Sequence, residues 1–320
     1  VERRKRKERL LQLMDRTASF YERVLEESNE AEAARALLAE RGLDAETLKA
    51  FRVGYSPSAW DKVLLASRQA GFSEEELTAA GLVRKAREGE QLFDRFRGRI
   101  MFPLADSRGR VIGFGARSMR DGQGPKYLNS SEGEIYHKGG QLYGLHLARA
   151  EAAKVGFTIL VEGYVDALAM HQAGLANVVA SMGTALTDEQ AAVLERTAPT
   201  LVLALDADRA GQAAMVKIGE VAAGRKLELR VVPMPAGKDP GDLILDPGAE
   251  RLRSLVAASE PFVAFRVRNV LETAELGSAE GKDRALQALR PIIAPQPPSV
   301  LKQELVHRIA VELDLADDLV

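Results

Sequence analysis

The sequence predicts an α/β protein in three parts: a mixed N-terminal α+β region, a central, mostly parallel sheet flanked by helices, and a helical C-terminal region. Apolar residues recur at helical spacing through the first eighty residues, four short strands alternate with helices between residues 157 and 232, and helical spacing returns after Pro247. This alternation favours a parallel sheet with right-handed crossovers. Because 320 residues suffice for two or three domains, we expect domains at 1–150, 151–247 and 248–320.

Helices account for most of the first eighty residues. An apolar stripe with helical spacing runs from Leu10 to Leu25. Ser58 precedes Asp61 and Ser73 precedes Glu76, each at the spacing of a capping box. The basic opening run 3–7 is interpreted as a solvated linker or helix end rather than as a nucleic-acid-binding arm.

Strands begin near residue 99. Residues 100–104 and 111–114 are apolar and flank a Ser107-Arg108-Gly109 turn, which predicts a hairpin. Pro103 predicts an edge or a bulge at its position, because proline cannot donate to a sheet. The polar stretch 121–140 is rich in glycine and predicts a long loop, and loops of that length are often functional.

The central region alternates four apolar strands with helices. Thr187 and Gln190 have the spacing of a capping box, and Gly174 and Gly224 are placed to end helices. The strands are expected at residues 157–161, 177–180, 200–205 and 227–232.

Acidic residues follow three of these strands. Glu162 follows the first strand, Asp206 and Asp208 the third, and Asp239 and Asp242 the fourth. Ligands of open parallel sheets gather beyond the carboxyl ends of the strands, and oxygen-rich clusters suit magnesium. A single such acid is more often a helix cap or turn residue. Acids at three strand ends therefore favour a metal site.

Basic residues concentrate elsewhere, although the formal net charge is only −2. Between Arg84 and Lys126, eleven Lys or Arg residues face five acids. A basic surface beside an acidic pocket is expected where a polyanion meets bound metal ions.

Several classes of protein are excluded by composition. The chain has no cysteine, which excludes disulfides and thiolate zinc sites. No apolar run approaches the roughly 20 residues that span a bilayer, and the basic start lacks the apolar segment of a signal peptide. We therefore expect no membrane partner and a cytoplasmic location. Because the first residue is Val1 and not Met, we also expect a fragment of a longer protein.

Three acidic motifs resemble the TOPRIM fold, which bacterial primases, topoisomerases and certain nucleases share. The motifs are Val161–Asp166, Leu205–Gly211 and Gly237–Pro240. The resemblance implies that magnesium, or alternatively manganese, is held by the carboxylates of Glu162, Asp206, Asp208, Asp239 and Asp242. The first three are the expected catalytic residues.

Some residues of the acidic motifs have additional or alternative roles. Glu162, besides holding metal, is a candidate for proton transfer. Asp166 and Arg209 are given supporting roles, although Asp166 could simply favour the first turn of its helix. Asp242 follows Gly241, where primases usually place an acid. A metal ligand and a helix cap remain equal interpretations of Asp242.

Four upstream segments resemble bacterial primase: Arg95–Pro103, Gly109–Arg117, Pro125–Ser130 and His137–Gly144. The resemblance covers nearly the whole chain and implies a DNA-directed RNA polymerase that uses single-stranded DNA and ribonucleoside triphosphates. Region 1–150 would bind template and nucleotide, and region 151–247 would hold the metals. The implied nucleic-acid or nucleotide contacts are Arg41, Arg95, Arg97, Arg99, Arg117, Lys126, Tyr127, Asn129 and Lys138.

Some alternatives stay open. Arg41 could equally cap a helix end. Another TOPRIM enzyme, a nuclease or a topoisomerase fragment, and a non-catalytic nucleic-acid-binding module are the rival functions. Complete bacterial primases also carry a zinc module and a helicase-binding domain. We expect neither in this sequence, and therefore no zinc, with the replicative helicase reached only through absent segments.

Overall fold

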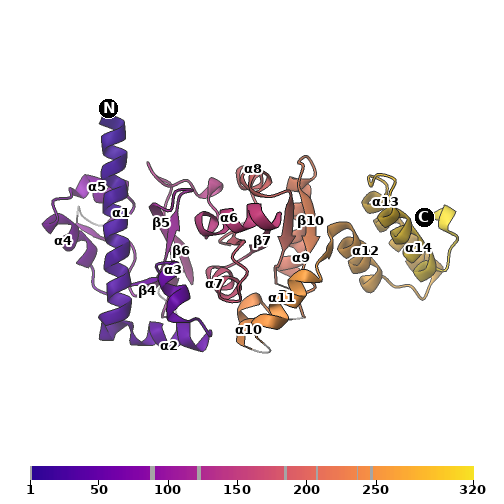
Figure 1. The fold of residues 1–320 in the computed structure, drawn as a ribbon, viewed down its shortest axis with the longest axis horizontal. Helices are drawn as coiled ribbons and strands as arrows, with labels where there is room; N and C mark the ends of the chain where they lie inside the picture. Colours follow the sequence, from indigo (N-terminus) through magenta and orange to yellow (C-terminus); the bar gives the residue numbers. More distant parts are fainter. Residues whose placement is uncertain are drawn as a thin grey trace.

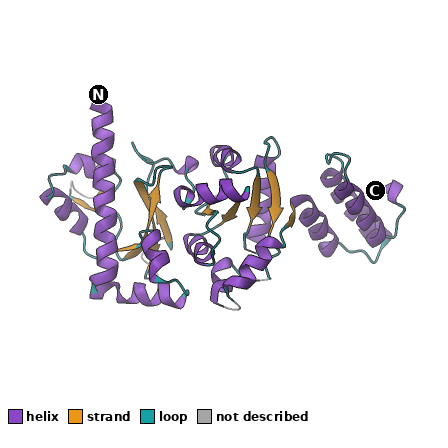
Figure 2. Ribbon diagram, viewed as in Figure 1, coloured by secondary structure: helices purple, strands orange, loops and turns teal. Residues whose placement is uncertain are grey.

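Three groups of elements lie side by side along an elongated molecule (Figure 1). The computed structural model describes residues 2–86, 91–120, 124–183, 186–206, 208–235, 237–245 and 248–320. The N-terminal elements occupy one end, a sheet flanked by helices lies in the middle, and helices form the other end (Figure 2). The predicted fold class, with a mostly parallel sheet between an α+β region and a helical region, is confirmed.

The N-terminal group combines helices with two small sheets. The larger sheet has the order β1-β4-β5-β6 and is antiparallel throughout, and β2 and β3 form an antiparallel two-stranded sheet. The helices are α1 (Glu2–Glu27), α2 (Glu32–Glu40), α3 (Ala45–Ala50), α4 (Lys62–Gln69) and α5 (Glu74–Ala79). The strands are β1 (Gly54–Ser56), β2 (Val83–Lys85), β3 (Leu92–Asp94), β4 (Arg99–Ala105), β5 (Val111–Ser118) and β6 (Tyr127–Asn129).

Helix α1 lies directly on this sheet. A Cβ atom on Gly54 would come within 2.6 Å of the Tyr21 backbone carbonyl carbon, so only glycine fits this crossing. The Tyr21 ring packs edge-on against Phe114 of β5, with centroids 5.4 Å apart. The buried apolar face of α1 therefore covers the sheet, as the predicted stripe requires.

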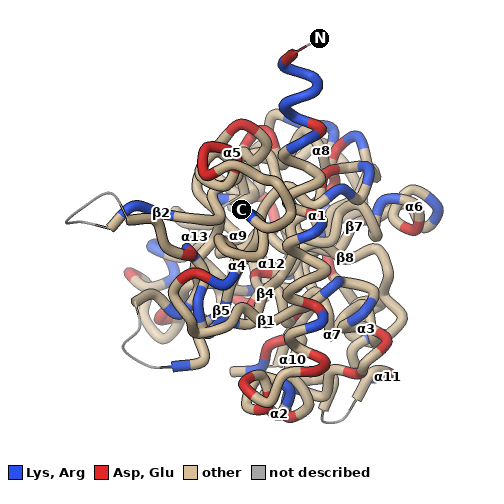
Figure 3. The backbone as a smooth tube through the Cα atoms, turned by 90° about the vertical axis from the view of Figure 1, so that its left-hand side faces the viewer, with Lys and Arg blue, Asp and Glu red and all other residues tan. Residues whose placement is uncertain are grey.

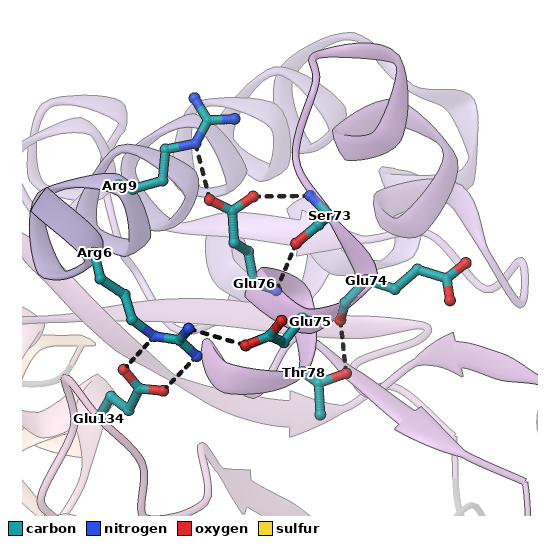
Figure 4. A network of polar contacts seen from close by, with 8 residues as sticks. All are labelled: Arg6, Arg9, Ser73, Glu74, Glu75, Glu76, Thr78 and Glu134. Carbon is teal, nitrogen blue, oxygen red and sulfur yellow. Dashed lines mark hydrogen bonds and ion pairs between the residues drawn. The ribbon is translucent and has the colours of Figure 1, made fainter. Parts of the chain in front are cut away.

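The basic opening run belongs to α1 and is partly paired (Figure 4). Arg6 contacts Glu75 and Glu134, and Arg9 contacts Glu76 at 2.9 Å. Glu76 also completes a capping box with Ser73, which confirms that prediction. The interpretation of this run as a helix end is confirmed.

Two sequence predictions in this region are wrong. Asp61 is the N-cap of α4 but makes no side-chain cap. Instead, the amides of Val63 and Leu64 donate to the Asp94 carboxylate at 2.7 and 3.0 Å. The stretch 121–140 is also not wholly loop, because β6 and a 3-10 helix, η2 (Lys138–Gly140), lie within it. Tertiary pairing with β5 decides the extra strand.

Pro103 lies in β4, an internal strand, but beyond the part that β1 covers. β1 pairs with Arg99–Met101 only, and a register shift follows between Leu104 and Ala105. No β1 residue pairs with the proline, so its missing N–H leaves no β1 carbonyl without a donor, and the predicted bulge lies just beyond it, between Leu104 and Ala105.

The central sheet has the order β11-β10-β9-β7-β8. Strands β10, β9, β7 and β8 are parallel and β11 is antiparallel. The strands are β7 (Phe157–Val161), β8 (Val178–Ala180), β9 (Thr200–Leu203), β10 (Glu228–Val231) and β11 (Glu260–Pro261). The helices are α6 (Leu145–Val155), α7 (Tyr164–Gln172), α8 (Asp188–Thr197), α9 (Arg209–Ala222), α10 (Pro240–Leu245) and α11 (Ala249–Ala257).

The C-terminal group is helical and has its own apolar cluster, which includes Val267, Leu289 and Ile309. Its elements are α12 (Phe262–Thr273), α13 (Ala279–Ile293), α14 (Val300–Leu313) and η3 (Asp317–Leu319). Among the described helices of the whole chain, none is both long and apolar enough to cross a membrane.

Candidate active site

The acidic residues of the three motifs meet at one edge of the central sheet. Glu162 directly follows β7, and Asp206 follows the neighbouring strand β9. Asp208 is the N-cap residue of α9, Asp239 directly precedes α10, and Asp242 lies in its first turn. Because β7, β9 and β10 are adjacent and parallel, their carboxyl ends bring these side chains together.

Burial and neighbouring charges disfavour the ionised forms of Glu162 and Asp206. Burial raises the pKa of Glu162, and the charges of Asp206 and Asp208 raise it further, while a hydrogen bond from the Asp206 backbone acts to lower it. Burial likewise raises the pKa of Asp206, helped by Asp239, Asp208 and Asp242. Both shifts are expected where anions share one partly dehydrated region.

Asp166 belongs to the same region. Burial, followed by the charges of Asp239 and Asp206, raises its pKa to about 7. The Gly163 amide donates to Asp166 Oδ2 at 3.1 Å in a capping-box arrangement at the start of α7. The structure therefore brings Asp166 beside the acids and also shows the local role in the first helical turn.

Three glycines allow the acidic motifs to fold tightly. A Cβ atom on Gly211 would lie 2.1 Å from the Asp206 carbonyl oxygen, and one on Gly163 would lie 2.8 Å from Asp166 Oδ2. A Cβ atom on Gly241 would meet Asp239 Oδ1 at 3.1 Å. Any side chain at position 241 would therefore require the Asp239 carboxylate that caps α10 to shift slightly.

Three of the clustered acids, Asp208, Asp239 and Asp242, also accept hydrogen bonds from backbone amides at the starts of helices. Asp208 Oδ1 accepts a hydrogen bond from the Gly211 amide at 2.8 Å. Asp239 Oδ1 accepts from the Asp242 amide at 2.7 Å, and Asp242 Oδ2 accepts from the Asp239 amide at 3.4 Å. These bonds fix the direction of each carboxylate, so capping and ligand roles are compatible.

The donor set fits a hard divalent cation. All the clustered side chains offer carboxylate oxygens, and Glu162 Oε1 is buried with no hydrogen-bond partner in the described residues. Within those same residues, no three Asp, Glu, His or Cys side chains converge as metal ligands would. The arrangement is thus a shared acidic region rather than a finished coordination shell.

Basic and aromatic side chains line the N-terminal sheet. Figure 3 shows Lys and Arg around β2 and β5, and acidic residues beside α10. Arg97 lies over the exposed Trp60 ring, with its guanidinium carbon 4.3 Å from the ring centroid. Arg95 donates to the Asn129 carbonyl oxygen, and Arg99 donates to the Pro125 carbonyl oxygen. Burial lowers the pKa of all three arginines.

Tyr127 on β6 follows the exposed Lys126, and its ring centroid lies 6.1 Å from that of Tyr164 at the start of α7. Tyr127 is 42% exposed, and its partial burial raises its pKa. Arg117 and Arg41 act to lower this pKa, whereas Asp166 and Asp239 act to raise it. Charged residues of both surfaces therefore act on this phenol. Arg41 also lies 3.7 Å from Asp242, measured from Nη1 to Oδ1.

Other predicted residues lie at the margins of this arrangement. Lys138 begins η2, and its amide donates to Glu132 Oε1. Arg110, a basic residue at the hairpin turn, pairs with Asp106 at 2.6 Å. Arg209 begins α9. Its side chain falls outside what the structure describes, as do Ala207 and Ala236 of the acidic motifs.

The sequence interpretation missed Tyr164, a buried residue that joins the two surfaces. Its ring stacks on Phe102 of β4 with centroids 4.6 Å apart, and its hydroxyl donates to Asn129 Oδ1 at 2.6 Å. A Cβ atom on Gly115 of β5 would lie 2.1 Å from the Tyr164 hydroxyl oxygen. The signal was present in the chain as an aromatic residue directly after Glu162-Gly163 and a glycine within a strand.

Comparison with known proteins gives three family matches in chain order. The DNA primase catalytic core, N-terminal domain, matches residues 20–149, a Toprim-like domain matches 159–244, and the DnaB-helicase binding domain of primase matches 263–318. The last match corrects the expectation that a helicase-binding segment is absent. Local periodicity could not identify it, because the region resembles any short helical bundle.

Individual relatives agree with these matches. The DNA primase of Deinococcus radiodurans is 42% identical over 252 residues, which cover 78% of this chain and 44% of that protein. The RNA polymerase domain of Mycobacterium tuberculosis primase, crystallised with double-stranded DNA, has a TM-score of 0.85 at 37% identity and covers 97% of this chain and 99% of that one. A primase catalytic domain bound to single-stranded DNA has a TM-score of 0.79 at 35% identity and covers 100% and 99%. The chain thus spans about half the length of the full relatives.

Proposed function

Because the chain belongs to the bacterial DNA primase family, we propose that it is a primase catalytic core that synthesises short RNA primers on single-stranded DNA from ribonucleoside triphosphates. The observation that carries the proposal is the contact between the acidic and basic surfaces, where Arg41 lies 3.7 Å from Asp242 and the Tyr164 hydroxyl donates to Asn129 of β6 at 2.6 Å. The family matches favour this function over a TOPRIM nuclease or a topoisomerase fragment.

A TOPRIM primase core uses divalent metal ions. We assign magnesium, or manganese in its place, to the carboxylates of Glu162, Asp206, Asp208, Asp239 and Asp242. When bound, such a cation supplies positive charge for the triphosphate and for the attacking 3′-hydroxyl. The carboxylates would hold it at the sheet edge, with their directions set by the caps of α9 and α10.

The chain's own groups have distinct tasks in this proposal. Glu162 would accept the proton of the 3′-hydroxyl, a role supported by its Oε1, which is buried and has no hydrogen-bond partner among the described residues. Asp166 supports the cluster from α7. Arg95, Arg97, Arg99, Arg117, Lys126 and Lys138 would bind phosphates, and Tyr127 and Asn129 would bind a base or sugar.

The three parts of the chain divide the work. Residues 1–150 would bind template and nucleotide, 151–247 would hold the metals, and 248–320 would contact the replicative helicase, since the helicase-binding family match falls there. Primer synthesis on a chromosome places the protein in the cytoplasm.

Primer synthesis can be tested directly. The protein is incubated with single-stranded template, four ribonucleotides and magnesium, and labelled products are resolved by size. We expect short RNA chains that depend on template and metal. Cleavage or relaxation of added DNA without new RNA would instead support the nuclease or topoisomerase alternatives.

A further inference from the structure

Gln172, the last residue of α7, contacts a loop of the N-terminal region. Its Nε2 donates to the Gly42 carbonyl oxygen at 2.7 Å, and its Oε1 accepts from the Asp44 amide at 2.8 Å. One half-buried side chain thus satisfies two backbone groups of the corner formed by residues 42–44 between α2 and α3. Figures 1 and 3 both place α2 and α3 beside α7 and α10.

The corner is closed from a second direction by α10. Gly42 has a φ of +70°, which a side chain rarely tolerates, and its Cβ atom would lie 2.6 Å from Leu245 Cδ2. The Asp44 side chain in turn caps α3 by accepting from the Thr47 amide at 2.7 Å. The corner is therefore enclosed between α7 and α10, with Gln172 making both side-chain hydrogen bonds to its backbone.

The residue immediately before this corner is Arg41. Its guanidinium lies 3.7 Å from Asp242, and each of the two side chains is 36% exposed. An exposed arginine loses conformational freedom when it binds a phosphate, and the total cost is smaller where the backbone that carries it is already fixed. The Arg41 amide is held at the end of α2 by its hydrogen bond to the Leu37 carbonyl oxygen at 3.1 Å, and Gln172 fixes two backbone groups of the corner that follows. Helix α7 is in turn anchored near the acidic cluster, because it begins two residues after Glu162 and the Tyr164 hydroxyl donates to Asn129 of the N-terminal sheet.

We propose that Gln172 is a positioning residue that holds the Arg41 guanidinium at the acidic cluster, where Arg41 binds the triphosphate of the incoming nucleotide. The inference rests on the proposed function. A triphosphate is favoured over the template backbone as the ligand, because Arg41 faces Asp242 within the acidic cluster, where metal-bound phosphates would lie. Gln172 touches the corner and not the reacting groups.

Kinetics of primer synthesis test the proposal with Gln172→Ala and Gln172→Glu. The glutamate keeps the acceptor for the Asp44 amide but cannot donate to the Gly42 carbonyl. We expect KM for ribonucleotides to rise by about 10-fold in both variants, with kcat changing by less than about 3-fold. Affinity for single-stranded DNA should stay unchanged. Gln296→Ala, which removes a hydrogen bond within the C-terminal helices, is the matched control and should leave KM unchanged.

A double variant shows whether Gln172 acts through Arg41. Arg41→Ala combined with Gln172→Ala should raise KM no further than Arg41→Ala alone, because the two residues form one unit. Hydrogen exchange provides a readout independent of activity: the Asp44 amide should exchange faster in Gln172→Ala, which removes its acceptor, and stay near wild type in Gln172→Glu, while the α13 amides should not change.

The outcomes separate the two proposals. Active wild-type protein with unchanged nucleotide KM in folded Gln172→Ala and Gln172→Glu would overturn the positioning role and leave the proposed function intact. Fully multiplicative KM effects in the double variant would also overturn it. A wild-type protein that makes no primers would overturn both. If Gln172→Ala melts well below wild type, Gln172→Glu gives the same KM comparison with one hydrogen bond retained.

Discussion

The acidic cluster and the basic surface are held in place by different means. The acids occupy strand ends, and their directions come from neighbouring backbone amides, as in the Gly211–Asp208 and Gly163–Asp166 contacts. The basic residues depend on partners distant in sequence. Arg97 lies over Trp60, and Arg95 donates to the carbonyl oxygen of Asn129 on β6.

This difference has a consequence for substitution. An Asn in place of a clustered Asp keeps the cap acceptor and the shape, so it should remove charge without disturbing the fold. Removing an arginine exposes an aromatic surface or leaves a carbonyl without its donor, so charge and packing change together. Variants of the acids should therefore separate chemistry from structure more cleanly than variants of the bases.

The largest effect is expected from Asp206→Asn. Asp206 lies among Asp239, Asp208 and Asp242, so its charge is central to metal binding. Primer synthesis should fall by at least about 100-fold while the circular dichroism spectrum and template affinity stay near wild type. Asp283→Asn, at an exposed acid in α13, is the control. Full activity in Asp206→Asn would remove this residue from the metal site.

Within the acidic cluster, Asp239 and Asp242 are expected to contribute unequally to primer synthesis. The Asp239 carboxylate caps α10 by accepting from the Asp242 amide at 2.7 Å. The Asp242 carboxylate accepts from the Asp239 amide at the longer distance of 3.4 Å and also faces Arg41. We expect Asp239→Asn to reduce synthesis severely and Asp242→Asn to raise the magnesium requirement moderately. Magnesium titration of both variants measures this. An unchanged magnesium optimum with a lower melting temperature in Asp242→Asn would assign that residue to capping alone.

The basic surface should respond to salt. Arg97→Ala and Lys126→Ala should each reduce the slope of log affinity for single-stranded DNA against log salt by about one or less, because each removes one phosphate contact. The affinity itself should drop several-fold. Arg308→Ala, at an exposed site in α14, should leave the slope unchanged. Slopes equal to wild type in both variants would place the template elsewhere.

The smallest effect on synthesis is expected from Asp94, an acid inside the basic region. Burial raises its pKa from 3.8 to about 6, despite hydrogen bonds from the Val63 and Leu64 amides. The folded state therefore binds the proton more tightly than the unfolded state, and this stabilisation is lost as pH rises through about 6. The stability advantage of wild type over Asp94→Asn should be larger at pH 4.5 than at pH 7, by about 2 kcal/mol.

Urea unfolding at the two pH values measures this difference. An equal advantage at both pH values would show that Asp94 titrates as an ordinary surface carboxylate. Primer synthesis by the variant at pH 7 checks that the acid has a structural role only.

Much of the fold was predictable because its signals are local. The strand β7 was predicted at the residues where it is found, and the capping boxes at Ser73 and Thr187 were correct. Alternation of strands and helices fixes a parallel sheet, and a parallel sheet places Glu162 and Asp206 at one edge. The grouping of acids therefore follows from residue order and strand direction alone.

Tertiary structure alone decided the remaining features. β6 forms because β5 offers it a partner, and Asp94 caps α4 from 31 residues away. Tyr164 and Gln172 connect segments far apart in the chain, and neither has a sequence pattern that names its partner. A periodic pattern records which face of an element is buried, but a hydrogen bond between distant segments depends on how the elements pack. Only the tertiary structure therefore determines how close the basic surface lies to the acidic cluster.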